Sequence, residues 1–171
     1  FVIALQMIAA YGTLYWKKFH VQAADREAAI TSGVIEIVEQ MHRTENRSAA
    51  AIVLANQISR LLNCRRVAVG WQRRREQQIE LAAISDLPKC DAGSETARQI
   101  VAAMNEAVGT GKVCAWPPTS PQQRTAAMMQ KAVSEASDNG IAISAPLSAL
   151  LDEEDESETI GAIHVLAPQS A

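Results

Sequence analysis

GIAISAPL (residues 140–147) and TIGAIHVL (residues 159–166) are the two stretches that decide the fold of this chain. Each is a short apolar segment of small and β-branched residues, which is typical of a buried β-strand. A strongly acidic connection, in which six of the seven residues 152–158 are Asp or Glu, joins them. Two such strands in succession predict an antiparallel hairpin.

A second hairpin is predicted further upstream. In RVAVGWQRR (residues 66–74), Val67, Val69 and Trp71 alternate with other residues at the period of a strand. The polar residues 75–77 form a turn, and QIELAAIS (residues 78–85) returns as the partner strand. Hairpins near both ends of the sheet-forming region favour a mostly antiparallel sheet over a doubly wound parallel one.

Two helices and a short strand are expected between the hairpins. Ser94 is a suitable N-cap for a helix that Gly109 and Gly111 end. A short strand over residues 112–116 stops at a Pro-Pro pair. The next helix is predicted to begin at Ser120 and Pro121 and to end at Asn139 and Gly140.

Two longer amphipathic helices precede the first hairpin. The first covers residues 23–43, and a polar break over residues 44–48 separates it from the second. Their apolar stripes comprise Ile30, Val34, Ile37, Val38 and Met41 in the first helix, and Ala51, Leu54, Ala55, Ile58, Leu61 and Leu62 in the second. The predicted fold is therefore α+β, a central antiparallel sheet flanked by helices, with an N-terminal helical extension.

The first 16 residues are very apolar and are followed directly by Lys17 and Lys18. They fall short of the roughly 20 residues that a membrane-spanning helix needs. We therefore favour a helix that buries its apolar stripe against a partner over a membrane segment, which stays open as an alternative. Because the sequence starts at Phe1 and not at Met, we expect it to be a piece of a longer protein.

The composition is that of an ordinary globular domain. The 171 residues are 48% hydrophobic and 20% charged, with a formal net charge of −3. This balance gives no general attraction to nucleic acid or to an anionic membrane. Three widely spaced cysteines, Cys64, Cys90 and Cys114, form no disulfide framework and favour a reducing cytoplasm.

The order of the predicted elements and their local sequences resemble the GAF family. CRRVAVGWQ followed by IELAAIS resembles the first hairpin of that family, and GIAISAPL with TIGAIHVL resembles its closing pair. Within the family, the Arg-rich hairpin, AMNEAV before a WPP turn, and AISDL look closest to GAF domains of bacterial HlyD-like membrane-fusion proteins of efflux and secretion systems. The resemblance implies a GAF-like domain over residues 44–171 and a helical extension over residues 1–43.

What the resemblance implies about function is regulatory. GAF domains bind small molecules between the sheet and the helices and loops over one face, and they commonly dimerise through the helices that enter and leave the domain. We therefore expect a cytoplasmic, dimerising, ligand-binding domain of a larger membrane-associated transport or signalling protein. The alternative is a structural assembly domain without a ligand, its cavity plugged by alanines and by Met104, Met128 and Met129.

No catalytic residue, metal site or cofactor is predicted. One GAF-like enzyme group, the free methionine sulfoxide reductases, uses three cysteines, but only Cys90 occupies a matching position here. The three histidines, His20, His42 and His164, are scattered without metal-binding spacing.

Four residues are candidates for binding a ligand. His164 lies mid-strand and is expected to share a face with Ile160, Ala162 and Leu166, where an imidazole can bond a ligand or the protein's own backbone. Ser144 lies in the partner strand of the closing hairpin. The other two candidates, Trp71 and Trp116, are expected either as flat pocket walls or as core residues.

Overall fold

The computed structural model describes residues 23–73, 78–88, 90–118, 127–150 and 157–169. The elements follow one another as α2 (Ala23–His42), α3 (Arg47–Leu62), β1 (Arg66–Gln72), β2 (Ile79–Ile84), α4 (Glu95–Thr110), β3 (Cys114–Trp116), α5 (Met128–Glu135), β4 (Ile141–Leu150) and β5 (Ser157–Ala167). The apolar segment over residues 1–16 lies outside the described residues.

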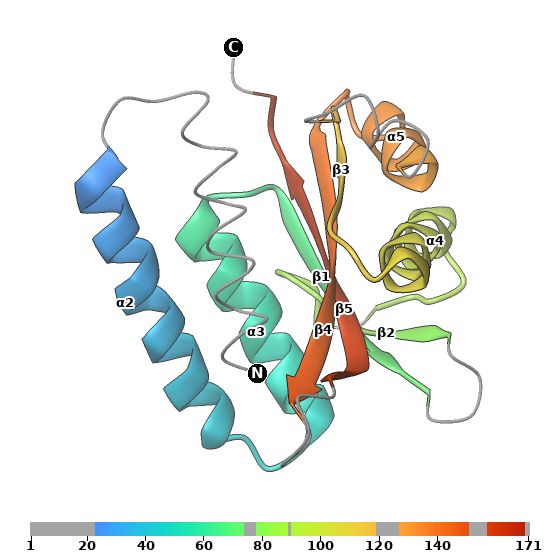
Figure 1. The fold of residues 1–171 in the computed structure, drawn as a ribbon. Coiled ribbons are helices and arrows are strands. Elements are labelled where there is room, and N and C mark those ends of the chain that lie inside the picture. Colours follow the sequence, from blue (N-terminus) through green and yellow to red (C-terminus); the bar gives the residue numbers. More distant parts are fainter. Residues whose placement is uncertain (1–22, 74–77, 89, 119–126, 151–156, 170–171) are drawn as a thin grey trace.

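The strands form a five-stranded antiparallel sheet in the order β2-β1-β5-β4-β3. Helices α4 and α5 lie on one side of it, α3 lies on the other, and α2 forms an outer layer beyond α3 (Figure 1). The α+β prediction with an antiparallel sheet between helices is therefore confirmed. In the part of the chain that is described, no helix is long and apolar enough to cross a membrane.

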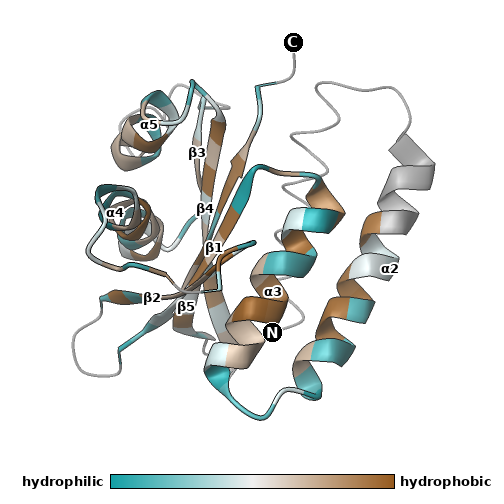
Figure 2. Cartoon of the chain, turned by 180° about the vertical axis from the view of Figure 1, so that it is seen from behind, coloured by the Kyte–Doolittle hydropathy of each residue, from teal (hydrophilic) through white to brown (hydrophobic). Residues whose placement is uncertain are grey.

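The helix ends follow the capping residues of the sequence. The Asn46 side chain accepts a hydrogen bond from the Ala49 N–H at 2.9 Å and starts α3 after the hydrophilic turn that leaves α2 (Figure 2). Ser94 caps α4 in the same way through the Ala97 N–H at 3.2 Å. Gly111, with φ of 63°, ends α4 in the left-handed conformation that favours glycine.

Helix α5 differs from its prediction. Its expected start at Ser120 and Pro121 lies outside the described residues. It ends at Glu135, short of the predicted stop, with Ala136 as its C-cap, and the turn that follows holds Asp138 and Asn139 in left-handed conformations with φ of 54° and 55°. The first N–H groups of α5 receive a cap from a distant residue of α4 (see below).

The core on the α3 side lies between α3 and the sheet. Its fully buried members include Leu54, Ile58, Val67 and Ile163. Helix α2 packs on α3 through its own stripe, in which Ile37 is buried and Val34, Val38 and Met41 are half-buried. The Gln57 Nε2 group also donates to Gln40 Oε1 of α2 at 2.8 Å.

Small residues line the sheet on the α4 side and let that helix approach closely. Ala68 and Ala162 are fully buried there, together with Ile100 and Met104 of α4. A Cβ atom on Gly70 would collide with Ile79 Cγ2 and lie 3.1 Å from the Glu80 carbonyl oxygen and 3.2 Å from Met104 Sδ, so a larger residue would force these neighbours to move. Met104 thus fills the space between helix and sheet, as the plugged-cavity alternative expects.

The expectation that Met128 and Met129 fill the same space is wrong. Their side chains are 54% and 44% exposed, because α5 turns this part of its surface to solvent. The inward positions of α5 are taken instead by Gln130, Val133 and Ser134.

The expectation that Ile160 shares a face with His164 is also wrong. The register between β4 and β5 shifts between Leu147 and Ser148, which pair with Gly161 and Thr159. This irregularity leaves Ile160 outside the regular alternation, and its side chain packs with the core on the α3 side. His164 and Ala162 keep the α4 side.

Gly161 permits the close packing of Trp71 on the α3 side. The two residues are cross-strand partners of β1 and β5. A Cβ atom on Gly161 would lie 2.4 Å from the Gly70 carbonyl oxygen and 2.9 Å from Trp71 Cε3. Gly161, within β5, therefore leaves the room that the indole ring occupies.

Replacing Gly161 with Ala should lower the free energy of unfolding by about 1–3 kcal/mol, because the added methyl group meets backbone and must displace it. Gly109→Ala is the matched control: it lies in α4 with open space around the new Cβ atom. This control should leave stability unchanged or raise it by up to about 1 kcal/mol. Urea denaturation measures both, and equal stability of the two variants would contradict the packing described.

Candidate functional site

The four candidate residues do not share one cavity. In antiparallel pairs the directly opposite residues lie on the same face of a sheet. Ser144 pairs with His164 on one side and with Cys114 on the other, so all three face α4 and α5. Trp116 shares that face at the sheet edge, whereas Trp71 is on the opposite face.

Ser144 and His164 are brought into direct contact. The Ser144 Oγ atom lies 2.8 Å from His164 Nδ1, and neither side chain has any exposed surface. The Ser144 hydroxyl also donates to Gln130 Oε1 at 3.2 Å. Because its single proton is used there, Ser144 must accept from His164, and the imidazole carries its proton on Nδ1.

The same hydrogen bonds continue from Gln130 to α4. Gln130 is fully buried, and its Nε2 group donates to the Ala103 carbonyl at 2.9 Å and to Glu106 Oε2 at 3.3 Å. The Glu106 carboxylate in turn accepts from the Met128 N–H at 3.0 Å and from the Met129 N–H. A carboxylate from α4 therefore caps the start of α5, a function that a residue just before α5 usually has.

One end of this network has an unused acceptor. With the proton on Nδ1, His164 Nε2 is a lone-pair acceptor, and it has no hydrogen-bond partner among the described residues although it is buried. Burial, assisted by the positive charge of Arg66, lowers the pKa of His164 from 6.5 to about 4. The imidazole is therefore neutral at physiological pH, and the network orders β4, β5, α4 and α5 without a buried charge.

Trp116 lies apart from this network, at the β3 edge. The ammonium group of Lys131 in α5 stands 5.5 Å from the centre of its ring. This cation–π contact ties α5 to the sheet edge.

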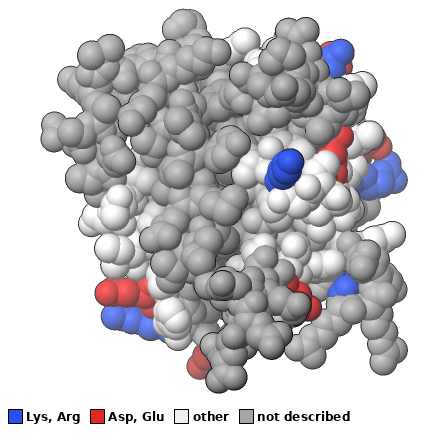
Figure 3. All heavy atoms as spheres, viewed as in Figure 1, with Lys and Arg blue, Asp and Glu red and all other residues white. Residues whose placement is uncertain are grey.

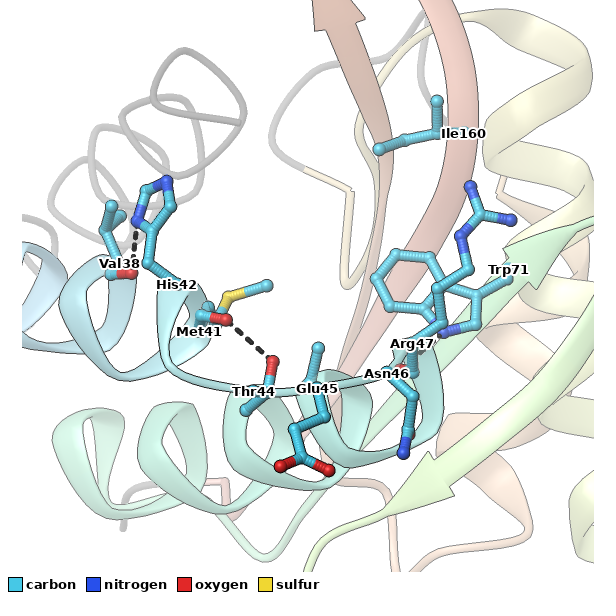
Figure 4. Close-up of a pocket in the computed structure, with 10 residues that line it drawn as sticks. Val38, Met41, His42, Thr44, Glu45, Asn46, Arg47, Trp71 and Ile160 are labelled. Atoms are coloured by element: carbon cyan, nitrogen blue, oxygen red, sulfur yellow. Dashed lines mark hydrogen bonds between the residues drawn. The ribbon is translucent and has the colours of Figure 1, made fainter.

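A cavity of about 290 Å³ lies on the other side of the sheet, where α2 turns into α3. Trp71 forms one wall, and residues from α2, the turn and β5 complete it (Figure 4). The residues that line it are Val38, Met41, His42, Thr44, Glu45, Asn46, Arg47, Ala50, Trp71 and Ile160. Of these, the sequence had singled out only Trp71 as a ligand-binding candidate.

The remaining residues of this cavity had no signal of their own in the sequence. Residues 44–48 showed only as a break between two helices, and Met41 only as part of a buried stripe. The polar break between the two amphipathic helices is the one sequence feature that marks this region, because it places a turn with charged side chains between two helices that pack on the domain.

Metal binding and nucleic-acid binding find no support in the parts described. No group of three or more His, Cys, Asp or Glu side chains there is arranged to hold a metal ion. On the face shown in Figure 3, the described Lys and Arg residues are scattered among Asp and Glu and form no single basic patch.

No protein-family model matches the chain, and no curated protein matches it either.

The contribution of His164 to the free energy of unfolding should fall by about 3 kcal/mol as the pH drops from about 6.5 to about 4. In this window the unfolded chain takes up a proton on His164, but the folded protein does not. The stabilisation by the neutral imidazole is fully present above pH 6.5 and is lost as the pH falls towards 4. Urea denaturation at several pH values measures it, and His164→Gln should lose this part of the pH dependence.

NMR gives the independent check. A His164 ring resonance that titrates at the ordinary value of 6.5 in the folded protein would contradict the burial described.

Proposed function

We propose that this chain is a GAF-like regulatory domain that acts through its N-terminal helix and has no catalytic activity of its own. The observation that carries the proposal is the place of α2. It forms an outer layer that packs on α3 (Figure 1), and of its described side chains only Ile37 is buried in the core on the α3 side. A helix attached in this way can change its position without unfolding the domain, as regulation through an entering helix requires.

The GAF-like assignment itself is supported by the sequence resemblance and by two features of the fold that the resemblance leads us to expect. The closing strands form the long hairpin that the resemblance expects, with Gly161 at a position that admits no side chain. The antiparallel sheet lies between helices on both faces. The wider context, a cytoplasmic domain of a membrane-associated transport or signalling protein of the HlyD-like kind, is part of the same proposal and rests on the resemblance alone.

Dimerisation through the N-terminal helices is supported by the outer surface of α2. Ile35 is 57% exposed, the largest exposure among the exposed large hydrophobic side chains of the described residues. Ile35 is not part of the stripe that packs on α3, because Ile37 and Val34 make that contact. An exposed isoleucine on an outer helix is the type of residue that a helix–helix interface buries.

The cysteines support a domain without thiol chemistry. Burial raises the pKa of Cys64 to about 11, and it also raises the pKa values of Cys90 and Cys114. A nucleophilic thiol needs the opposite environment, one that favours the thiolate. Cys64 packs on the α3 side and Cys114 on the α4 side of the sheet, so the sheet lies between them. These facts argue against the methionine sulfoxide reductase alternative.

The second candidate function is that of an assembly domain that binds no ligand. It is favoured by the filled space between the sheet and α4, the side on which Met104, Ile100 and Gln130 are fully or almost fully buried. The resemblance places a GAF ligand between a sheet face and its covering helices. On this side the protein's own side chains fill the space around Met104, while a cavity of about 530 Å³ remains between α4 and the ends of the neighbouring strands, lined by Gln72, Gln78, Asn105, Val108, Gly109 and Thr159.

Analytical ultracentrifugation tests the dimer. The wild-type chain should sediment as a dimer, and Ile35→Glu should sediment as a monomer, because a carboxylate buried at the interface loses its hydration. Leu87→Glu is the matched control, since Leu87 is 48% exposed and lies outside α2, after β2. A monomeric wild type, or equal weakening by both variants, would overturn dimerisation through α2.

A further inference from the structure

The cavity between α2, α3 and the sheet has the surroundings of a ligand site. Its volume of about 290 Å³ is at the lower end for small-molecule pockets, which span about 300–1,000 Å³. It therefore suits a molecule of one or two rings. Its walls are mainly apolar, with Met41 and Val38 of α2 on one side and Trp71 and Ile160 of the sheet on the other (Figure 4).

The aromatic wall is fixed in place before any ligand arrives. The Trp71 indole Nε1 group donates to the Arg47 carbonyl at 3.1 Å, which ties the ring to the first turn of α3. Gly161 leaves the space for the ring on the strand beside it. A wall held on two sides loses little conformational entropy when a ligand packs against it.

A cationic group stands at the same wall. The Arg47 guanidinium lies 5.9 Å from the centre of the Trp71 ring, and its side chain runs along the indole towards Ile160 (Figure 4). No ion pair of Arg47 is found within the described residues. Its charge is therefore available to an anionic group of a molecule in the cavity.

The other polar groups do not cancel this charge. The Glu45 carboxylate points to the opposite side of the turn from Arg47 (Figure 4). His42 Nδ1 lies 2.9 Å from the Val38 carbonyl, which can only accept, so Nδ1 donates and Nε2 remains as a further polar atom at the rim. The nearby start of α3, which has no acidic residue in its first turn, adds positive potential.

We infer that this cavity binds a small planar aromatic carboxylate, its ring packed against Trp71, Met41 and Ile160 and its carboxylate paired with Arg47. The inference deepens the proposed regulatory function, because the cavity is lined by the outer helix α2 and by the sheet at once. A bound molecule joins these two parts and favours the position of α2 seen here, which is how a ligand biases an equilibrium between two states.

The test uses the whole chain and two probes, indole-3-acetate and its uncharged analogue indole-3-acetamide. Titrations followed by ¹H–¹⁵N NMR should show the acetate shifting the Trp71 indole N–H and the backbone signals of residues 38–47. The acetamide should bind at least about tenfold more weakly, because it cannot form the ion pair with Arg47. Arg47→Gln should reduce the affinity for the acetate to that for the acetamide.

Arg60→Gln is the matched control. Arg60 is an exposed arginine in the last turn of the same helix, far along α3 from the cavity, and its loss should leave both affinities unchanged. Three outcomes would overturn the inference: no saturable binding of the acetate, equal binding of both probes, or a loss of affinity in Arg60→Gln as large as in Arg47→Gln.

Binding and dimerisation are separated by Ile35→Glu. If this variant is monomeric and still binds the acetate, both proposals stand. If the wild-type chain is monomeric and binds the acetate, the dimer proposal alone fails. If it is a dimer and does not bind, the ligand inference alone fails.

Discussion

The central place of β5 is the constraint on which the rest of the structure depends. It pairs with β1 on one side and β4 on the other, so its side chains alternately enter both cores. Ile163 and Val165 supply the α3 side, while Ala162 and His164 supply the α4 side. A shift of one residue would exchange the two sets, which would put the imidazole among aliphatic side chains.

The two faces created in this way serve different purposes. On the α4 side, small residues of the sheet allow the helices to approach closely. There, Ser144 of β4 forms hydrogen bonds with His164 of β5 and with Gln130 of α5. Such a network holds because the partners satisfy each other, apart from His164 Nε2. On the α3 side, the indole of Trp71 donates a hydrogen bond to the Arg47 carbonyl in the first turn of α3, and its ring forms one wall of the cavity there. The buried hydrogen-bond network and the cavity lined by Trp71 are thus on opposite faces of the sheet.

Local elements were largely predictable because their signals are local. The strands around Trp71 and His164, the caps at Ser94 and Gly111, and the break after α2 all act within a few residues of themselves. The capping of the first turn of α5 and the face of Ile160 depend on contacts between distant parts of the chain. Glu106 caps α5 from 22 residues away, and the bulge at Ile160 exists only in the paired hairpin.

The sequence by itself determined the α+β class, the antiparallel hairpins, the amphipathic helices and the candidates Trp71, Trp116, Ser144 and His164. Only the tertiary structure decided how these candidates are grouped. It joined Ser144 to His164, placed Trp71 on the opposite face and added Arg47 beside it. The physical reason is that periodicity fixes which residues share a face of one element, whereas the neighbour on that face is set by strand pairing and by side-chain volume.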